Sequence, residues 1–228
     1  MNPRISSQVR EVVFGMEDGM VSTMGAITGI AVATGNPFVV LVSGFVIISV
    51  ESISMGVGSY LSNKSEKDVN LKKIDEEKSE LIKYPEAEKE ELYVMYCQNG
   101  WSKEVARTMA DEASQKPDLL LSEMTYHELK IVSDNLGKPF ENAIFMGVSY
   151  VLGGGLPLLP YLLFPVPLAL GISIPLTMAG IFLLGSVTTR FTGRKWWKAG
   201  FEMFVLAGIA AGVGYGVGRI ADVVITRS

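Results

Sequence analysis

The sequence predicts an all-α, multi-pass membrane protein with five transmembrane helices and a helical cytosolic insert between the second and the third. The chain is apolar overall, with a mean hydropathy of +0.30 and 24 glycines among 228 residues. Its charges are concentrated in one central segment, and the remainder contains runs of about 20 mostly apolar residues, the length that crosses a hydrocarbon core. Glycine-rich apolar helices are typical of bilayers, because lipid offers no partners to open backbone.

The five expected spans follow from these runs and from the turns that separate them. Asn36-Pro37 predicts a tight turn between the first two spans, and Pro165-Val166-Pro167 predicts another between the third and the fourth. The spans are expected near residues 12–33, 38–61, 142–164, 168–189 and 199–221.

Lysine and arginine predict the orientation. Basic residues precede the first span, fill the insert and lie between the fourth and fifth spans, whereas only Arg219 and Arg227 fall on the other side. We therefore expect the N-terminus and the insert in the cytosol and the C-terminus outside.

The segment 63–138 differs in composition from the rest of the chain. It carries 17 Asp and Glu and 12 Lys and Arg, whereas the other residues include only seven acids. One helix is expected to continue from the second span to a break at Pro85, and others over 86–98, from Ser102 as N-cap, and from Pro117. The predicted domains are 1–62 with transmembrane helices 1 and 2, 63–138 as the metal-binding insert, and 139–228 with helices 3 to 5.

Composition also excludes several classes of site. The single Cys97 excludes a disulfide framework and a four-cysteine zinc site, and the single His127 excludes a histidine-rich metal site. A net charge of −4 gives no support to a nucleic-acid partner.

Two pairs of glutamates in the insert have the spacing of a shared helix face. Glu77 and Glu80 are three residues apart, as are Glu88 and Glu91, and the break at Pro85 allows the two faces to meet. Clustered carboxylates suit divalent cations such as Mg, Ca, Mn and Fe(II). The alternative is an ordinary solvated face with intrahelical ion pairs.

A thioether accompanies a further carboxylate in the same segment. Met124 and Glu128 are four residues apart, which places them on one helix face. A thioether favours a softer transition metal over Mg or Ca.

Acidic residues also fall within the expected spans, where they are costly and indicate function by default. Asp18 in the first span and Met55 in the second are each about 9 Å from the cytosolic ends, counted at 1.5 Å per residue. Glu51 lies one turn deeper than Met55, and Glu11 two turns before Asp18, so that they outline a polar track. Glu17 also lies within the first span. The alternatives are acids paired structurally within a bundle, or interfacial acids that reach the headgroups.

Glycines recur at four-residue spacing in the first and last spans, and such faces allow helices to approach closely. Five spans rarely enclose a polar pathway alone. The glycine faces therefore favour a homodimer with the pathway at its interface. Glycine packing within one subunit is the alternative.

The ordered set of these motifs resembles the vacuolar iron transporter family over nearly the whole chain. The resemblance rests on FGMEDGMVSTMGAITG, SMGVGSYLS, EEKSELIKYPEAEKEEL, MTYHE and LGGGLPLLPYLL. It implies a dimer of five-span subunits that exchanges Fe(II) for protons. The family's membrane metal site falls on Asp18 and Met55. Its metal-binding insert falls on Glu77, Glu80, Glu88, Glu91, Met124 and Glu128.

One motif departs from the family pattern, which often reads Gly-Glu-Tyr where this chain has Gly58-Ser59-Tyr60. One interpretation is that Glu51 supplies the missing carboxylate. With a short N-terminus and no sorting extension, a prokaryotic cell membrane is expected rather than a vacuole.

The predicted function is export of Fe(II), with Mn(II) or another divalent transition metal left open, from the cytosol in exchange for protons. The partners are then metal ions, protons and the lipid bilayer, with no permanent cofactor and no enzymatic activity. Two alternatives stay open: a di-iron ferroxidase in the insert, and a membrane-anchored metal buffer or sensor. The ferroxidase lacks the expected Glu-x-x-His pairs, and a mere anchor has no reason to carry Asp18 and Glu51.

Overall fold

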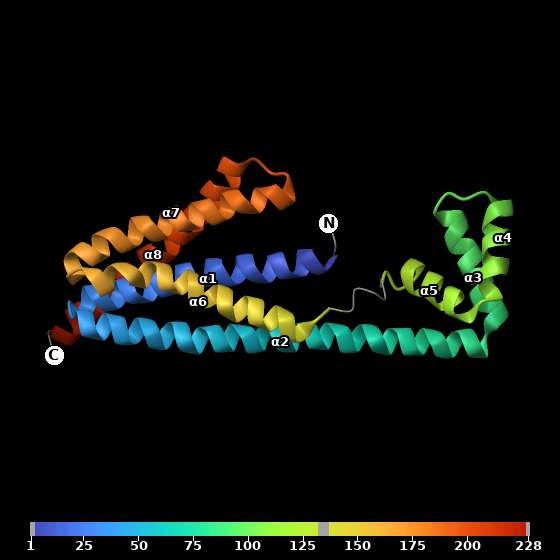
Figure 1. The fold of residues 1–228 in the computed structure, drawn as a ribbon, viewed down its shortest axis with the longest axis horizontal. Coiled ribbons are helices and arrows are strands. Elements are labelled where there is room, and N and C mark those ends of the chain that lie inside the picture. The colour runs from blue at the N-terminus through green and yellow to red at the C-terminus, as the bar shows by residue number, and fades with distance from the viewer. Residues whose placement is uncertain (1–2, 132–136, 227–228) are drawn as a thin grey trace. The chain divides into compact units, whose positions relative to one another are not determined.

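The chain is all-α, as predicted. The computed structural model describes residues 3–131 and 137–226, and within these ranges the chain forms eight helices and no strand. Figure 1 shows them in order. The helices are α1 (Pro3–Thr34), α2 (Pro37–Lys83), α3 (Pro85–Gln98), α4 (Lys103–Ser114), α5 (Pro117–His127), α6 (Pro139–Leu163), α7 (Val166–Thr192) and α8 (Trp196–Thr226).

Four of the described helices, α2, α6, α7 and α8, are long and apolar enough to cross a membrane. The fifth predicted span, 12–33, lies in α1, which does not meet the same measure. The reason is local: Glu17 and Asp18 interrupt its apolar run, and Ser, Thr and Gly residues dilute it. α1 nevertheless packs along α6, α7 and α8, and buries Met24 and Ile27 completely.

The chain divides into two compact units, residues 1–61 with 139–228 and residues 62–138. α2 contributes to both. Its 47 residues extend over about 70 Å, more than twice the thickness of a hydrocarbon core of roughly 30 Å. Only its apolar part, up to Leu61, can therefore span a bilayer, and the charged remainder belongs to the second unit.

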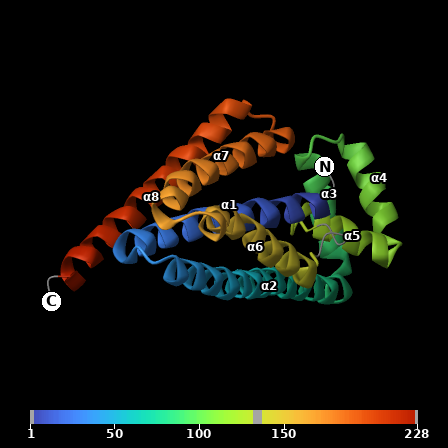
Figure 2. The same ribbon diagram turned by 60° about the vertical axis from the view of Figure 1, so that its left-hand side comes forward.

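Glycines allow α1 to touch its neighbours backbone to backbone in the first unit. A Cβ added at Gly19 would lie 2.4 Å from the carbonyl oxygen of Tyr150 in α6, and one at Gly153 would lie 2.3 Å from that of Met16. Gly214 and Gly218 of α8 approach Gly25 and Gly29 in the same way. Because each series of contacts advances along both chains together, α1 runs parallel to α6 and to α8, and Figure 2 shows the three helices.

The second unit has its own small core, formed where α3, α4 and α5 pack together. Its fully buried members include Leu92, Ala106 and Met124. The Ser102 hydroxyl accepts a hydrogen bond from the Val105 backbone N–H at 3.4 Å, so the predicted N-cap of α4 is confirmed. Proline begins both α3 and α5, where the missing N–H leaves no bond unmade.

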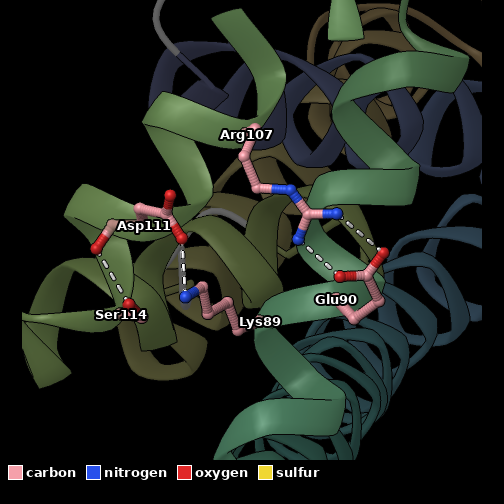
Figure 3. A network of polar contacts seen from close by, with 5 residues as sticks. All are labelled: Lys89, Glu90, Arg107, Asp111 and Ser114. Atoms are coloured by element: carbon pink, nitrogen blue, oxygen red, sulfur yellow. Dashed lines mark hydrogen bonds and ion pairs between the residues drawn. The ribbon is translucent and has the colours of Figure 1, made fainter. Parts of the chain in front are cut away.

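Ion pairs join α3 to α4 on the surface of this unit (Figure 3). Arg107 donates two hydrogen bonds to Glu90, at 2.5 and 3.1 Å, and its guanidinium lies 3.9 Å from the centre of the Tyr93 ring. Lys89 pairs with Asp111 at 2.6 Å. These contacts fix the direction of α3, which carries two of the glutamates singled out by their spacing.

Candidate metal-binding sites

Three helices of the first unit bring polar side chains together in an otherwise apolar bundle. Asp18 of α1 is partly buried and interacts electrostatically with Glu51 of α2. Both carboxylates also interact electrostatically with the side chain of Tyr150 in α6. The structure thus groups two of the acids that the sequence placed in a polar track, and adds a tyrosine.

Tyr150 is the residue that the sequence reasoning missed. Its side chain is fully buried, and its hydroxyl lies 2.6 Å from Oγ of Ser22. Ser22 in turn donates to the backbone carbonyl of Asp18, also at 2.6 Å. The only signal in the sequence was a Ser-Tyr pair beside the Gly153–Gly155 run of a predicted span, and buried tyrosines commonly need a polar partner.

Met55, the predicted thioether ligand, is partly buried on α2, one turn after Glu51. Glu51 itself is exposed on the surface of the unit. The two side chains therefore share a helix face, as their spacing predicts.

Glu11 is held at the junction of α1 and α2. Its side chain is 4% exposed, accepts a hydrogen bond from the Ser59 hydroxyl at 2.9 Å, and forms an ion pair with Arg10 at 3.0 Å. Ser59 is the residue at which this chain departs from the family's Gly-Glu-Tyr pattern. In place of a second carboxylate, the chain presents a hydroxyl that binds the carboxylate of Glu11.

In the second unit, the five predicted glutamates lie near one another. Glu77 is 3% exposed, and burial together with the charges of Glu128, Glu88 and Glu80 and a hydrogen bond with Glu128 raises its pKa to about 8. Glu88 is 7% exposed, and its pKa is raised by burial and by the charges of Glu91, Glu80 and Glu128. The pairs on α2 and α3 thus meet across Pro85, and Glu128 joins them from the end of α5.

This cluster is electrostatically unfavourable as it stands. Within the part of the chain that the structure describes, Oε1 of Glu77 is buried and has no hydrogen-bond partner. Buried carboxylates without cations normally take up protons. A bound divalent cation would remove the same penalty, so the cluster favours either protons or metal.

Met124 differs from its glutamate neighbours in environment. It is fully buried in the apolar core of the second unit, against residues such as Leu92 and Tyr96. Its backbone carbonyl accepts the N–H of Glu128 at 2.8 Å. The thioether therefore packs in the core, one turn from the carboxylate with which it was predicted to act.

The one histidine has structural partners. His127 Nε2 lies 3.4 Å from Glu123, Nδ1 lies 2.9 Å from the Asn99 amide, and the ring packs edge-on against Tyr96. Among the described residues, no three His, Cys, Asp or Glu side chains come close enough together to hold a metal ion.

Comparison with known proteins places these residues in a family. Residues 9–219 match the VIT family. The chain is 28% identical over 215 residues to vacuolar iron transporter 1 of Arabidopsis thaliana, covering 94% of this chain and 86% of that protein. It is 27% identical to the vacuolar iron transporter of Toxoplasma gondii (strain ATCC 50861 / VEG), over 96% of this chain and 76% of that protein. It is also 27% identical to vacuolar iron transporter cccA of Arthroderma benhamiae (strain ATCC MYA-4681 / CBS 112371), over 96% and 80%. The family match covers both clusters and most of each of the five long helices, and the chain therefore belongs to the VIT family.

Proposed function

We propose that this protein exports a divalent transition-metal ion, Fe(II) in the first place, from the cytosol across a bilayer in exchange for protons. Several matched relatives are named as vacuolar iron transporters, which supports iron as the cargo. Membership in this family also confirms the prediction that the chain is not an enzyme.

The observation that carries the proposal is the position of two acids, the partly buried Asp18 of α1 and Glu51 of α2, near enough to repel each other on an apolar helical bundle. Placing a charged carboxylate in apolar surroundings costs free energy, and such residues are retained where an ion or a proton has to pass. Met55, on the face of Glu51, adds the soft ligand that favours a transition metal over Mg or Ca. A simple membrane anchor for a metal buffer would need none of these residues.

The insert serves as the capture site in this proposal. Glu77, Glu80, Glu88 and Glu128 interact with one another, and the raised pKa of Glu77, about 8, means that metal binding near neutral pH releases a proton. The ion then passes to Asp18 and Met55, and the membrane acids take up protons from the far side.

The topology is also part of the proposal. α1 runs parallel to α6 and α8 and in backbone contact with both, so it crosses the bilayer with them although its own composition is less apolar. Five crossings leave the N-terminus and the insert in the cytosol and the C-terminus outside. Export across a cell membrane, or across a vacuolar membrane as in the relatives' names, then removes the ion from the cytosol.

A homodimer is proposed for the same reason that the sequence suggested it. Asp18 and Glu51 are not enclosed by the helices of one subunit, since Glu51 is exposed on the surface of the unit. A second subunit would cover that face and complete a pathway.

Metal flux into proteoliposomes tests the proposal. The purified protein should move Fe(II), and competition with Mn(II), Zn(II) and Mg(II) ranks the cargo. Asp18→Ala and Met55→Ala should each reduce the flux at least about tenfold, the loss typical of disturbed metal sites. Glu202→Gln is the matched control, because it removes an exposed carboxylate of the same unit, paired with Arg194 at 2.6 Å. Parental flux in both site variants would contradict the proposed pathway.

A further inference from the structure

The first unit has an apolar groove between α7 and α8. Its volume is about 640 Å³, and its lining comes from α7 between Ile174 and Leu183 and from Phe204 of α8. A groove of this size between helices is large enough to hold a ligand. Figure 1 and Figure 2 both show α7 on the opposite side of α1 and α6 from α2. The groove is therefore not on the face of Glu51, where a second subunit is proposed.

Glycine contacts explain where the groove begins. A Cβ added at Gly185 of α7 would lie 2.8 Å from the carbonyl oxygen of Ala199, so the two backbones touch near the short connection between the helices. Farther along, a Cβ added at Gly208 of α8 would meet only the methyl group of Met178, at 3.5 Å. Over the length of the groove the helices are thus separated by side chains, and space remains beside their apolar faces.

Basic residues follow the groove at the end nearest the α7–α8 connection. Arg190 is seven residues after Leu183, which places both on one face of α7, about 10 Å apart along the helix. Lys195 immediately precedes α8, and Lys198 lies in its first turn. Headgroups add roughly 5–8 Å to each side of a hydrocarbon core. When the groove lies in the acyl layer, these side chains therefore lie at the level of the phosphates.

The charges of these residues are available to a ligand. Arg190, Lys195 and Lys198 are exposed and form no ion pair with the described residues. The neighbouring Arg194 pairs with Glu202 at 2.6 Å, so the acid of this region is already bound. The end of the groove thus carries an excess of positive charge.

Two tryptophans lie at the same level. Phe182, which lines the groove, packs edge-on against Trp196, with ring centres 6.2 Å apart. Trp197 is half exposed, and Nζ of Lys198 lies 5.6 Å from the centre of its ring. Tryptophan is enriched at the level of lipid headgroups. Topology alone explains basic residues at a cytosolic helix end, but it does not explain an apolar groove that leads to them.

We propose that this groove binds one phospholipid with an anionic headgroup. An acyl chain lies against α7 and α8, and Arg190, Lys195 and Lys198 bind the headgroup phosphate. Basic pockets between membrane helices recognise anionic headgroups in this way, and each Lys or Arg near the surface strengthens the attraction about fivefold. The inference goes beyond the proposed transport function, and the proposed topology places this lipid in the cytosolic leaflet. Because the lipid contacts both helices, it stabilises their packing.

Lipid binding by the full chain in detergent tests the inference without any transport. Phosphatidylglycerol is compared with phosphatidylcholine that carries the same acyl chains. Native mass spectrometry counts the lipids retained, and thermal unfolding measures the stability of the protein. One phosphatidylglycerol per subunit should be retained, and it should raise the melting temperature more than phosphatidylcholine does. Equal retention and equal melting temperatures with the two lipids would overturn the inference, and this comparison decides if a variant does not fold.

Charge variants test the headgroup contact. The combined variant Arg190→Gln, Lys195→Gln and Lys198→Gln should bind phosphatidylglycerol more weakly, by about fivefold for each charge removed. The matched control removes as many charges from exposed positions of the second unit, with glutamine replacing Lys73, Lys78 and Lys103. It should bind the lipid as the parent does. Equal affinities of the two combined variants would contradict the headgroup contact.

Filling the groove tests the acyl-chain contact. Ala179 lines the groove and is exposed, so Ala179→Phe takes the space of the chain without entering the helix packing. The variant should lose the retained lipid. Leu176→Phe is the control, because Leu176 is 38% exposed on the same helix but does not line the groove. Retention of the lipid by Ala179→Phe would leave only diffuse surface attraction and would rule out the groove.

Two further results would replace the lipid by another occupant. If Ala179→Phe converts a dimer to a monomer while Leu176→Phe does not, a second copy of the chain occupies the groove. If glycerol 3-phosphate alone raises the melting temperature as much as phosphatidylglycerol does, the basic residues bind a free anion. Either result overturns the inference and leaves the proposed transport function untouched, since neither measurement involves metal.

Discussion

At Glu77 a carboxyl group is buried among other carboxyl groups, with Glu128, Glu88 and Glu80 near enough to raise its pKa to about 8. In the unfolded chain the same group titrates near 4.5. When the chain folds without metal, Glu77 therefore either takes up a proton or is buried as a carboxylate that its acidic neighbours repel. The residue that the proposal assigns to metal capture is, in the metal-free protein, a source of instability.

The stability of the metal-free insert should consequently depend on pH. Between about pH 4.5 and 8 the folded state binds more protons at Glu77 than the unfolded state, so stability is full below the unfolded pKa and falls as pH rises toward 8. Most of this loss of stability is expected between about pH 4.5 and 8. Hydrogen exchange of residues 62–138 in the full chain, corrected for intrinsic exchange rates, measures it.

Glu77→Gln is the control for that dependence. The neutral amide cannot titrate, so protection at pH 8 should exceed that of the parent and change little with pH. Protection in the parent that is flat from pH 5 to 8, or that increases, would contradict the described environment of Glu77.

Replacing Glu77, Glu80, Glu88 and Glu91 together with glutamine should remove most metal binding by the insert. Helix content should persist, because Gln and Glu have similar helix propensities. Equilibrium titration of the full chain with Fe(II) under anaerobic conditions gives the stoichiometry, and circular dichroism checks the helices. Replacing Glu66, Glu76, Glu86 and Glu104 instead removes as many carboxylates from exposed positions, and the stoichiometry should be unchanged. Equal stoichiometry in all three proteins would leave the four glutamates as a solvated face.

Sequence spacing could predict the glutamate pairs because each pair lies on one helix, where three residues fix a common face. Sequence spacing could not predict the contacts that Tyr150 and Ser59 make. The partners of these residues, Ser22 and Glu11, are on other helices, so the contacts depend on the register of helix packing. For the same reason the spacing of Met124 and Glu128 did not reveal that the methionine packs in a core.

At the scale of elements, local chemistry predicted where three of the helices begin. Pro85, Ser102 and Pro117 mark the beginnings of α3, α4 and α5 as expected, since each acts through its own backbone or hydroxyl. α1 was harder, because its acids and small residues serve contacts with other helices. Its glycines lower the helix propensity of α1, and only the close approach of α6 and α8 explains their positions.

The contact of α1 with α6 makes a matched pair of predictions within three residues. Gly153→Ala places a methyl group 2.3 Å from the carbonyl of Met16 and must separate the helices, at a cost of about 1–3 kcal/mol. Gly155→Ala meets nothing within 4 Å, and should be neutral or stabilise by about 0.5–1 kcal/mol through helix propensity. Thermal unfolding in detergent compares them, and equal melting temperatures would contradict the close approach of α1 and α6.

At the scale of the whole molecule, the net charge of the membrane site has to be balanced both with and without the metal ion. A divalent ion beside one carboxylate leaves uncompensated charge in a medium of low dielectric constant, where burial costs several kcal/mol. Exchange for protons on Asp18 and Glu51 keeps the loaded and the empty protein closer to neutral. Metal and proton movement should therefore be coupled, and Glu51→Gln should weaken the coupling more than it weakens metal binding, since the amide resembles the protonated acid but cannot titrate.

Simultaneous recording of Fe(II) and pH in proteoliposomes tests this coupling most directly. A proton gradient directed against the metal flux should accelerate Fe(II) movement in the parent protein, and each burst of metal flux should be accompanied by proton movement in the opposite direction. In Glu51→Gln the two records should separate, with metal binding largely retained. Fe(II) flux in the parent protein that is the same with and without the pH gradient, and that moves no protons, would contradict antiport and leave a channel or uniporter.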